Sequence, residues 1–409
     1  MLKKISVEHL RVGMHLHAFC GSWMDHPFWR TKFIIEDPND IQLVLASSVR
    51  EVWINTDEGL DVEHGQLVEE ADSKVAEALA NGKVSDEVVE RVSIQNEMDR
   101  AGKIVAKAKQ AVTSMFQEVR MGRALDAQDA LPLVEEISNS VMRNPGALIS
   151  IARLKNKDEY TYMHSVAVCA LMVSLARQLG MDEEATRKAG LAGLLHDVGK
   201  MAIPDEILNK PGKLTDDEFN IVRNHPVAGY EILLESKGVD AMVLDVCRHH
   251  HEKVDGGGYP DNLEGDNLSI YARLGAVCDV YDAITSNRPY KDGWCPAESL
   301  RRMAEWCKYG QFDSRIFQAF VKSVGIYPIG SLVRLESGKL GVVIDQNEKS
   351  LLAPKVKVFY SIKSGTRLKP QILDMSLAMT RDKIASHEES GKWDIPDLNE
   401  LWSGRTLSA

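Results

Sequence analysis

Residues 164–180, HSVAVCALMVSLARQLG, are apolar on nearly every face when the segment is drawn as a helix. A helix of this kind has no face that suits water, so other elements must surround it. Gly180 is a natural stop at its C-terminal end. Asp182 can cap a second helix, which runs on toward His196. The sequence therefore predicts a helical domain built around a buried central helix.

The helical pattern extends from about residue 130 to 325 and then changes. A third helical stretch, SIYARLGAVCDVYDAITS (269–286), carries its apolar residues on one face. After Pro328, SLVRLESGKLGVVI (331–344) is typical of two strands around a Ser-Gly turn, and KVKVFYS (355–361) alternates as a strand does. The predicted fold is mainly α, with a small β-containing N-terminal domain and a short β-rich C-terminal extension.

At 409 residues the chain is too long for one ordinary core. We expect five parts, which follow the changes in pattern. They are a small N-terminal domain (1–65), a charged helical connector (66–135), a helical domain (136–327), a small β extension (328–380) and a C-terminal tail (381–409).

Two of these segments leave alternatives open. The connector carries nine acidic and four basic side chains over residues 66–100. It is either a helix that forms a homodimer or a solvated helix without a partner. The aromatic loop with Trp23, Phe28 and Trp29 is either a partner surface or part of the core of the N-terminal β unit.

Charge and hydropathy exclude several classes of protein. A net charge of −11 argues against a broad DNA or RNA footprint but not against a small anionic substrate bound in a cleft. The longest strongly apolar stretch, 166–176, is far short of the roughly 20 residues that span a bilayer. The first residues lack the apolar region of an export signal. Six scattered Cys indicate reduced thiols, so we expect a cytoplasmic protein.

Six of the twelve His lie between residues 164 and 251. A single His in a helix is more often structural than a ligand, but these six have acidic neighbours. His196 is followed directly by Asp197, and Asp279 and Asp282 share one face of a later helix. A mixture of imidazole and carboxylate suits Fe, Mn or Zn. Near a helix end Asp197 can address one ion from a different side than His196 and can bridge to a second.

Five segments in chain order form one set of motifs: His164, HDVGK (196–200), NHP (224–226), HHHEKVDGGGYP (249–260) and DVYDAITSNRPYK (279–291). Together they resemble the HD-GYP family of cyclic di-GMP phosphodiesterases. The resemblance covers about 130 residues in order and spacing, and it implies an HD-type helical bundle as the catalytic domain. The first 65 residues resemble a small domain of unknown function that is found ahead of HD-GYP domains.

The resemblance implies a role for each matching residue. The metal ligands would be His164, His196, Asp197, His225, His250, His251 and Asp279. Asp197 would bridge two ions and, with His196 and Lys200, form the catalytic group. Substrate contacts would come from Lys200, Arg288, Lys291 and Tyr259. The alternatives are an exposed basic loop for Arg288 and Lys291 and plain packing for Tyr259. We expect His249 to be outer-shell or structural, and Asp282 to orient a ligand or cap local backbone groups.

The cofactors implied are two divalent metal ions, with Fe or Mn favoured and Zn, Ni, Mg and Co as alternatives. Family members with three metals carry a Glu four residues before the first His. Tyr160 stands at that position here, and Glu159 would point about 100° away on a helix. We therefore expect two ions and not three.

The activity implied is hydrolysis of cyclic di-GMP to linear pGpG and on to GMP, which lowers a bacterial second messenger controlling biofilm and motility. One alternative is an HD-type phosphohydrolase that acts on another nucleotide. The other is a cyclic di-GMP sensor that contacts diguanylate cyclase (GGDEF) domains through the DGGGYP segment (255–260).

Overall fold

The chain divides into two compact units in the computed structural model. Residues Met1–Gly82 and Arg301–Ser314 form the first unit, and Lys83–Leu300 and Arg315–Ala409 form the second. The structure describes residues 2–19, 33–47, 49–62, 66–67, 92–154, 160–210, 212–286, 293–347 and 350–404. The aromatic loop with Trp23, Phe28 and Trp29 lies outside these ranges.

The first unit contains a five-stranded antiparallel sheet in the order β3-β2-β4-β1-β5. Its strands are β1 (Leu2–Ser6), β2 (His15–Phe19), β3 (Phe33–Ile34), β4 (Glu51–Asn55) and β5 (Gln66–Leu67), with a 3-10 turn, η1 (Val7–His9), after β1. Helix α1 (Pro38–Ala46) begins after Asp37, whose carboxylate accepts a hydrogen bond from the backbone of Asn39.

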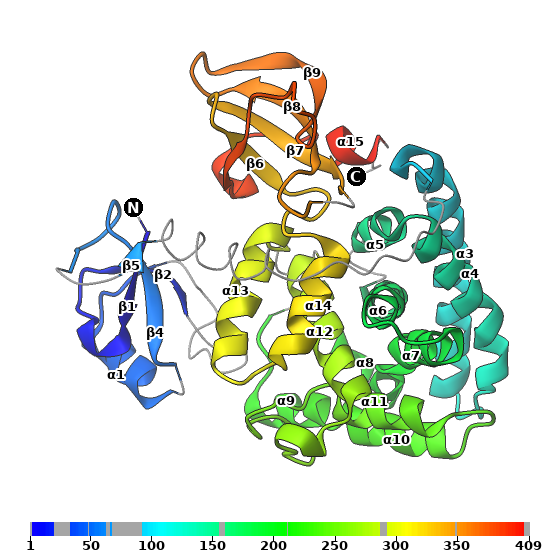
Figure 1. The fold of residues 1–409 in the computed structure, drawn as a ribbon. Coiled ribbons are helices and arrows are strands. Elements are labelled where there is room, and N and C mark those ends of the chain that lie inside the picture. The colour runs from blue at the N-terminus through cyan, green and yellow to red at the C-terminus, as the bar shows by residue number, and fades with distance from the viewer. Residues whose placement is uncertain are drawn as a thin grey trace. The chain divides into compact units, whose positions relative to one another are not determined.

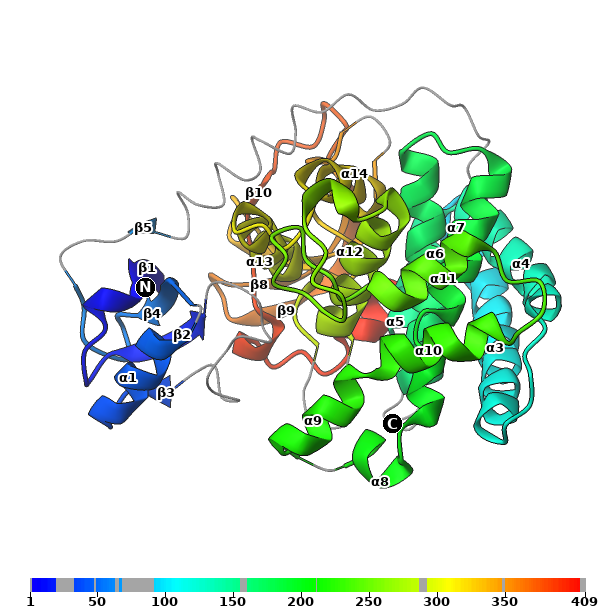
Figure 2. The same ribbon diagram turned by 90° about the horizontal axis from the view of Figure 1, so that it is seen from below.

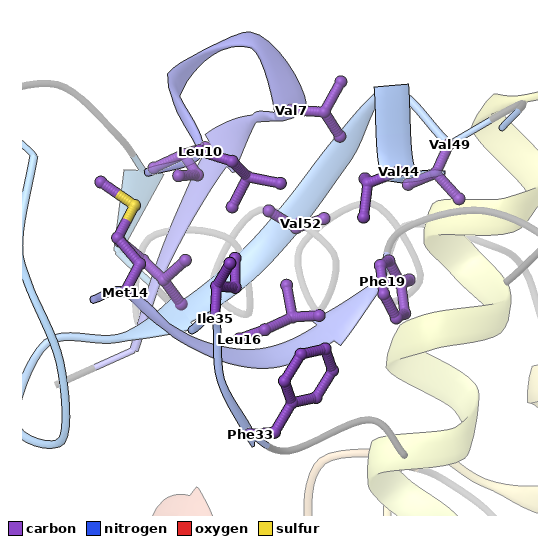
Figure 3. Packing of buried hydrophobic residues seen from close by; sticks show 12 residues of the cluster. Val7, Leu10, Met14, Leu16, Phe19, Phe33, Ile35, Val44, Val49 and Val52 are labelled. Atoms are coloured by element: carbon purple, nitrogen blue, oxygen red, sulfur yellow. The ribbon is translucent and has the colours of Figure 1, made fainter. Parts of the chain in front are cut away.

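The core of this unit lies between one face of the sheet and α1. Leu16 of β2, Val52 of β4 and Val44 of α1 point into it, as Figure 3 shows. These side chains are at most 1% exposed. The small β-containing N-terminal domain is thereby confirmed. The sheet continues past residue 65, the boundary expected from the sequence, because β5 pairs with β1.

The helices that carry the site belong to the second unit (Figure 1). They are α3 (Ile94–Arg120), η3 (Ala127–Ala130), α4 (Leu131–Arg143), α5 (Pro145–Arg153), α6 (Tyr160–Gln178), α7 (Glu183–Leu195), η5 (Val198–Ala202), α8 (Asp205–Leu208), α9 (Asp216–Arg223), α10 (His225–Leu234), α11 (Ala241–His249), η6 (Gly265–Asn267) and α12 (Ile270–Thr285), followed by α13 (Pro296–Lys308) and α14 (Ser314–Val324). The boundary between the units falls within α13. The mainly α architecture is confirmed.

Helix α6 is the buried centre that the sequence predicts. Every residue from 163 to 176 is buried, and α4, α5, α7 and α12 pack around the helix (Figure 2). Gly193 of α7 allows the closest approach, because a Cβ there would lie 2.9 Å from the carbonyl oxygen of Val168. Asp182 caps α7 as expected, its carboxylate accepting from the backbone of Ala185. Helix α7 ends at Leu195, and His196 is its C-cap residue.

Helix α3 includes much of the segment expected to be a charged connector, and it packs within the helical unit. Its buried face includes Ala101, Ala108, Val112 and Phe116, and it packs against α5 and α6. The small alanines permit this close packing. The described part of the connector after residue 92 is therefore integral to the helical unit.

A second five-stranded antiparallel sheet, in the order β10-β6-β7-β8-β9, confirms the β-rich extension. Its strands are β6 (Leu332–Leu335), β7 (Lys339–Asp345), β8 (Lys355–Ser361), β9 (Thr366–Asp374) and β10 (Ile384–His387). The expected turn between the first two contains Gly338, with φ of 77°. Strand β10 lies within the segment expected to be a tail. The chain then forms η7 (Ser390–Lys392) and α15 (Leu398–Ser403).

Among the described residues, no helix is both long enough and apolar enough to cross a membrane.

Candidate metal centre

The seven residues expected to bind metal come together from five helices of the second unit. Six are at most 6% exposed, and His251 is half-buried. Most stand at helix ends, where a side chain can point along the axis of its helix into a shared space. His164 lies in α6, His196 and Asp197 follow α7, His225 begins α10, His250 and His251 follow α11, and Asp279 lies in α12.

Four of the imidazoles are held with one nitrogen pointing into the centre. In each, Nδ1 has an oxygen acceptor outside the centre, so this nitrogen carries the proton and Nε2 is the nitrogen that faces the centre. The acceptors are Asp282 Oδ2 for His164 (2.6 Å), Gly193 O for His196 (2.8 Å), Val222 O for His225 (2.7 Å) and Cys247 O for His250 (2.9 Å). This is the arrangement by which proteins orient metal-binding His.

The two oxygens of Asp197 face two different pairs of imidazoles. Oδ2 lies 3.5 Å from His164 Nε2 and 3.4 Å from His196 Nε2. Oδ1 lies 3.2 Å from His225 Nε2 and 3.8 Å from His250 Nε2. The carboxylate therefore stands between two sets of nitrogen donors, with one oxygen directed at each.

Asp279 completes the donor set. Its Oδ1 lies 2.9 Å from His164 Nε2, and its Oδ2 lies 3.6 Å from His251 Nδ1. Three groups of donor atoms fall within 4.8 Å of one another: His164, His196 and Asp279; His225, His250 and His251; and His196, Asp197 and His250. The first two groups share no residue.

The donors fit divalent cations. Ligand atoms about 2.1 Å from one ion lie roughly 3 Å apart, which is close to the spacings found here. His196 Nε2 and Asp197 Oδ1 are buried and lack a hydrogen bond within the described part of the chain. Leaving such atoms unsatisfied costs free energy, and a cation between them would remove that cost.

Burial and neighbouring charges shift the pKa values of the groups in the centre. Burial opposes ionisation of Asp197, but the charge of Lys200 and the neighbouring His196 hold the pKa of this carboxyl well below its usual range. Burial lowers the pKa of His251 to about 3, and that of His250 also lies well below its ordinary value. These shifts favour the neutral imidazole at His250 and His251, the form that binds metal. At His196 burial also opposes the charged form, but the charge of Asp197 outweighs it and raises the pKa of that imidazole.

Asp282 and His249 have the supporting positions expected of them. Asp282 holds His164, as described above. His249 points away from the centre: its Nδ1 lies 2.8 Å from Asp245 Oδ1 and its Nε2 lies 2.9 Å from Asp261 Oδ2. It thus links α11 to the segment after the Gly-Tyr-Pro turn, a structural role.

The expected substrate-binding residues are only partly described. Lys200 Nζ lies 2.5 Å from Asp197 Oδ2, so it reaches the donor set. Tyr259 is 8% exposed, and its ring stacks on that of His251 with centroids 4.8 Å apart. Arg288 and Lys291 lie outside the described residues.

Three residues that the sequence analysis did not single out shape the site. Glu252 is buried and accepts hydrogen bonds from the backbone of Asp261 and Leu263, which fixes the loop around Tyr259. Its place in the HHHE segment was a usable signal. Arg223 lies over the ring of Tyr259 with Cζ 4.7 Å from the centroid, and nothing in the sequence indicated this.

Gly199 of HDVGK is the third. A Cβ there would lie 2.0 Å from the carbonyl oxygen of His225 and 2.4 Å from the backbone nitrogen of Gly229. The absence of a side chain lets η5 and α10 touch through their backbones. That contact brings Asp197 and His225 to the same centre.

Two segments of the chain match known protein families. Residues 2–130 match a domain of unknown function, DUF3391, and residues 146–316 match the HD domain. The first match extends through the segment expected to be a connector.

Several curated proteins are similar to this chain. The cyclic di-GMP phosphodiesterase PA4108 of Pseudomonas aeruginosa is 53% identical over 409 residues, which cover 100% of this chain and 97% of that protein. The cyclic di-GMP phosphodiesterase response regulator RpfG of Xanthomonas campestris is 44% identical over 150 residues (36% and 39%). The 3′3′-cGAMP-specific phosphodiesterase 1 of Vibrio cholerae is 35% identical over 167 residues (41% and 38%). The chain therefore belongs to the HD-GYP family of cyclic di-GMP phosphodiesterases.

Proposed function

We propose that this protein hydrolyses cyclic di-GMP to linear pGpG, and pGpG further to GMP. The full-length similarity to a cyclic di-GMP phosphodiesterase supports this substrate. The observation that carries the chemistry is the position of Asp197, whose two oxygens each face a separate pair of imidazoles. The alternatives of a sensor and of another nucleotide substrate have no observation in their favour.

The proposed cofactor is a pair of divalent ions, Fe or Mn. His164, His196 and Asp279 would hold one, and His225, His250 and His251 the other, with Asp197 shared between them. Two such ions supply an activated water at neutral pH and stabilise the charge of an in-line phosphoryl displacement. No Ser or Cys nucleophile is needed from the chain.

The residues around the donors orient a metal ligand, supply positive charge to the reacting phosphate and enclose it. Asp282 keeps the ring of His164 in place. The ammonium of Lys200 lies 2.5 Å from Asp197 Oδ2, and with the phosphodiester present it would contact a phosphate oxygen. Tyr259 and His251 form one wall. Arg288 and Lys291 are proposed to supply further positive charge to the dianionic substrate.

We further propose that the protein acts in the cytoplasm. A homodimer formed through the charged connector is proposed from its helical, charged composition, and a contact with GGDEF domains through the 255–260 segment is proposed from the family resemblance.

The experiment incubates metal-loaded protein with cyclic di-GMP and separates the products by chromatography. We expect pGpG and then GMP, with 3′3′-cGAMP cleaved more slowly in a parallel reaction. Asp197→Ala should lose both bound metal and hydrolysis, because the carboxylate serves both sets of donors. Cyclic di-GMP binding without product would favour the sensor, and faster cleavage of 3′3′-cGAMP would overturn the proposed substrate.

A further inference from the structure

Arg223 is a cation at the edge of the centre that has no ion pair within the described part of the chain. It is the last residue of α9 and is exposed. No carboxylate among the described residues lies within ion-pair distance of its guanidinium, although the chain is acidic overall. Arg248, nearby on α11, is by contrast paired with both oxygens of Asp261.

Tyr259 holds this guanidinium beside the donor set. The ring contacts Arg223 on the outside and His251 on the inside, with distances of 4.7 Å to Cζ and 4.8 Å between ring centroids. The backbone N–H of Tyr259 also donates to the carbonyl of His251 at 3.3 Å. A guanidinium that rests on an aromatic ring keeps its N–H edge available for an anion. The charge is thus placed one aromatic ring away from a proposed metal ligand.

The substrate offers an anion for that position. Cyclic di-GMP has two phosphodiester groups in one ring, and both carry charge. While one is held at the metal donors, the other must lie outside them. Lys200 is directed inward, with its ammonium on Asp197 and its side chain 19% exposed. It therefore suits the phosphate under attack, and the second phosphate needs a cation farther out.

We propose that Arg223 binds the phosphodiester of cyclic di-GMP that is not being cleaved. The inference rests on the proposed function and adds a specificity-determining residue to it. Recognition of a second phosphate at a fixed distance from the reacting one would favour cyclic dinucleotides over diesters with a single phosphate.

The test compares cyclic di-GMP with GpG, which has both guanines but one phosphodiester. Arg223→Ala should raise KM for cyclic di-GMP roughly 10-fold or more, because it removes a charge-assisted hydrogen bond, with little change in kcat. The effect on GpG, measured as KM or as a competitive inhibition constant, should be much smaller. Arg223→Lys should recover part of the loss and Arg223→Gln none.

Three results separate the explanations. If Arg223→Ala weakens binding of cyclic di-GMP and GpG equally, Arg223 contacts a guanine base or supports Tyr259, and the inference is overturned. An unchanged KM for cyclic di-GMP would overturn it as well. Arg187→Ala, at an exposed position of α7, is the matched control and should behave as the wild type. If the wild type fails to cleave cyclic di-GMP while it cleaves another diester, the proposed function itself fails.

Discussion

His164 Nδ1 donates to Asp282 Oδ2 at 2.6 Å, and both residues are almost fully buried. Through this contact Asp282 does not itself become a metal donor. It fixes the tautomer and the angle of the His164 ring, which is a proposed metal donor. A second Asp–His pair on the same unit, Asp245 with His249 at 2.8 Å, has similar geometry but faces away from the centre. The Asp282–His164 pair therefore orients a proposed metal ligand, whereas the Asp245–His249 pair stabilises the fold away from the centre.

Asp282→Ala should weaken metal binding by roughly 10- to 100-fold, because His164 loses its orienting acceptor. The metal affinity of Asp282→Asn should lie between those of this variant and the wild type, since the amide oxygen can still accept the hydrogen bond from His164. Competition with a chelator measures the affinity. Asp245→Ala is the matched control and should keep metal affinity near that of the wild type. Equal losses in the two alanine variants would contradict the orienting role.

Gly199→Ala should lower the free energy of unfolding by about 3 kcal/mol or more, because the new methyl group meets the backbone of α10. His225 belongs to that helix, so bound metal should fall as well. Urea unfolding and metal analysis on the same preparation check both effects. Gly391→Ala, where a Cβ meets nothing within 4 Å, should change stability by less than about 0.5 kcal/mol.

The sequence was informative wherever a pattern repeated over many residues. The apolar stretch that became α6, the cap at Asp182 and the alternation in β8 all led to the observed elements. The candidate metal ligands could be named because the types and intervals of these residues match the motifs of the HD-GYP family. Each of these signals lies in consecutive residues or in fixed spacing along the chain.

Other features depend on contacts that no local pattern contains. Strand β10, IASH, is four residues long, and its pairing with β6 comes from tertiary structure. The alanines of α3 that the structure buries are equally compatible, from sequence alone, with a solvated helix, because its packing partners are distant in the chain. Arg223 and Tyr259 are 36 positions apart and meet only because α9 and the loop after α11 converge. Sequence spacing alone gives no reason to join them.

Glu97→Gln should destabilise the helical unit by about 3 kcal/mol at pH 7. The side chain of Glu97 is fully buried and accepts from Ser140 at 2.8 Å and from Arg143 at 2.7 and 2.8 Å. Burial opposes its ionisation, but the bonds to Arg143 and Ser140 prevail and lower the pKa.

The lowered pKa means that folding favours the ionised form. Its contribution is therefore complete above the unfolded pKa of about 4.3 and is lost as the pH falls below that value. The difference in unfolding free energy between wild type and Glu97→Gln should shrink from pH 5 to pH 3.5. Glu118→Gln, in an exposed pair with Arg123, should show a difference below about 1 kcal/mol throughout. A constant difference for Glu97→Gln would contradict the assignment.

Tyr160 is the first residue of α6 and precedes His164 by four positions, which places the two on the same face one helical turn apart. Phenol is a poor ligand beside imidazole and carboxylate, so the wild-type chain should retain two ions. Tyr160→Glu supplies a carboxylate at that place and should raise the content toward three ions per chain, whereas Tyr160→Phe should stay at two. Elemental analysis of protein purified without oxygen gives the ratio. Three tightly bound ions in the wild type would show that the residues already described can hold a third without that carboxylate, and the division of the donors around Asp197 would have to be redrawn.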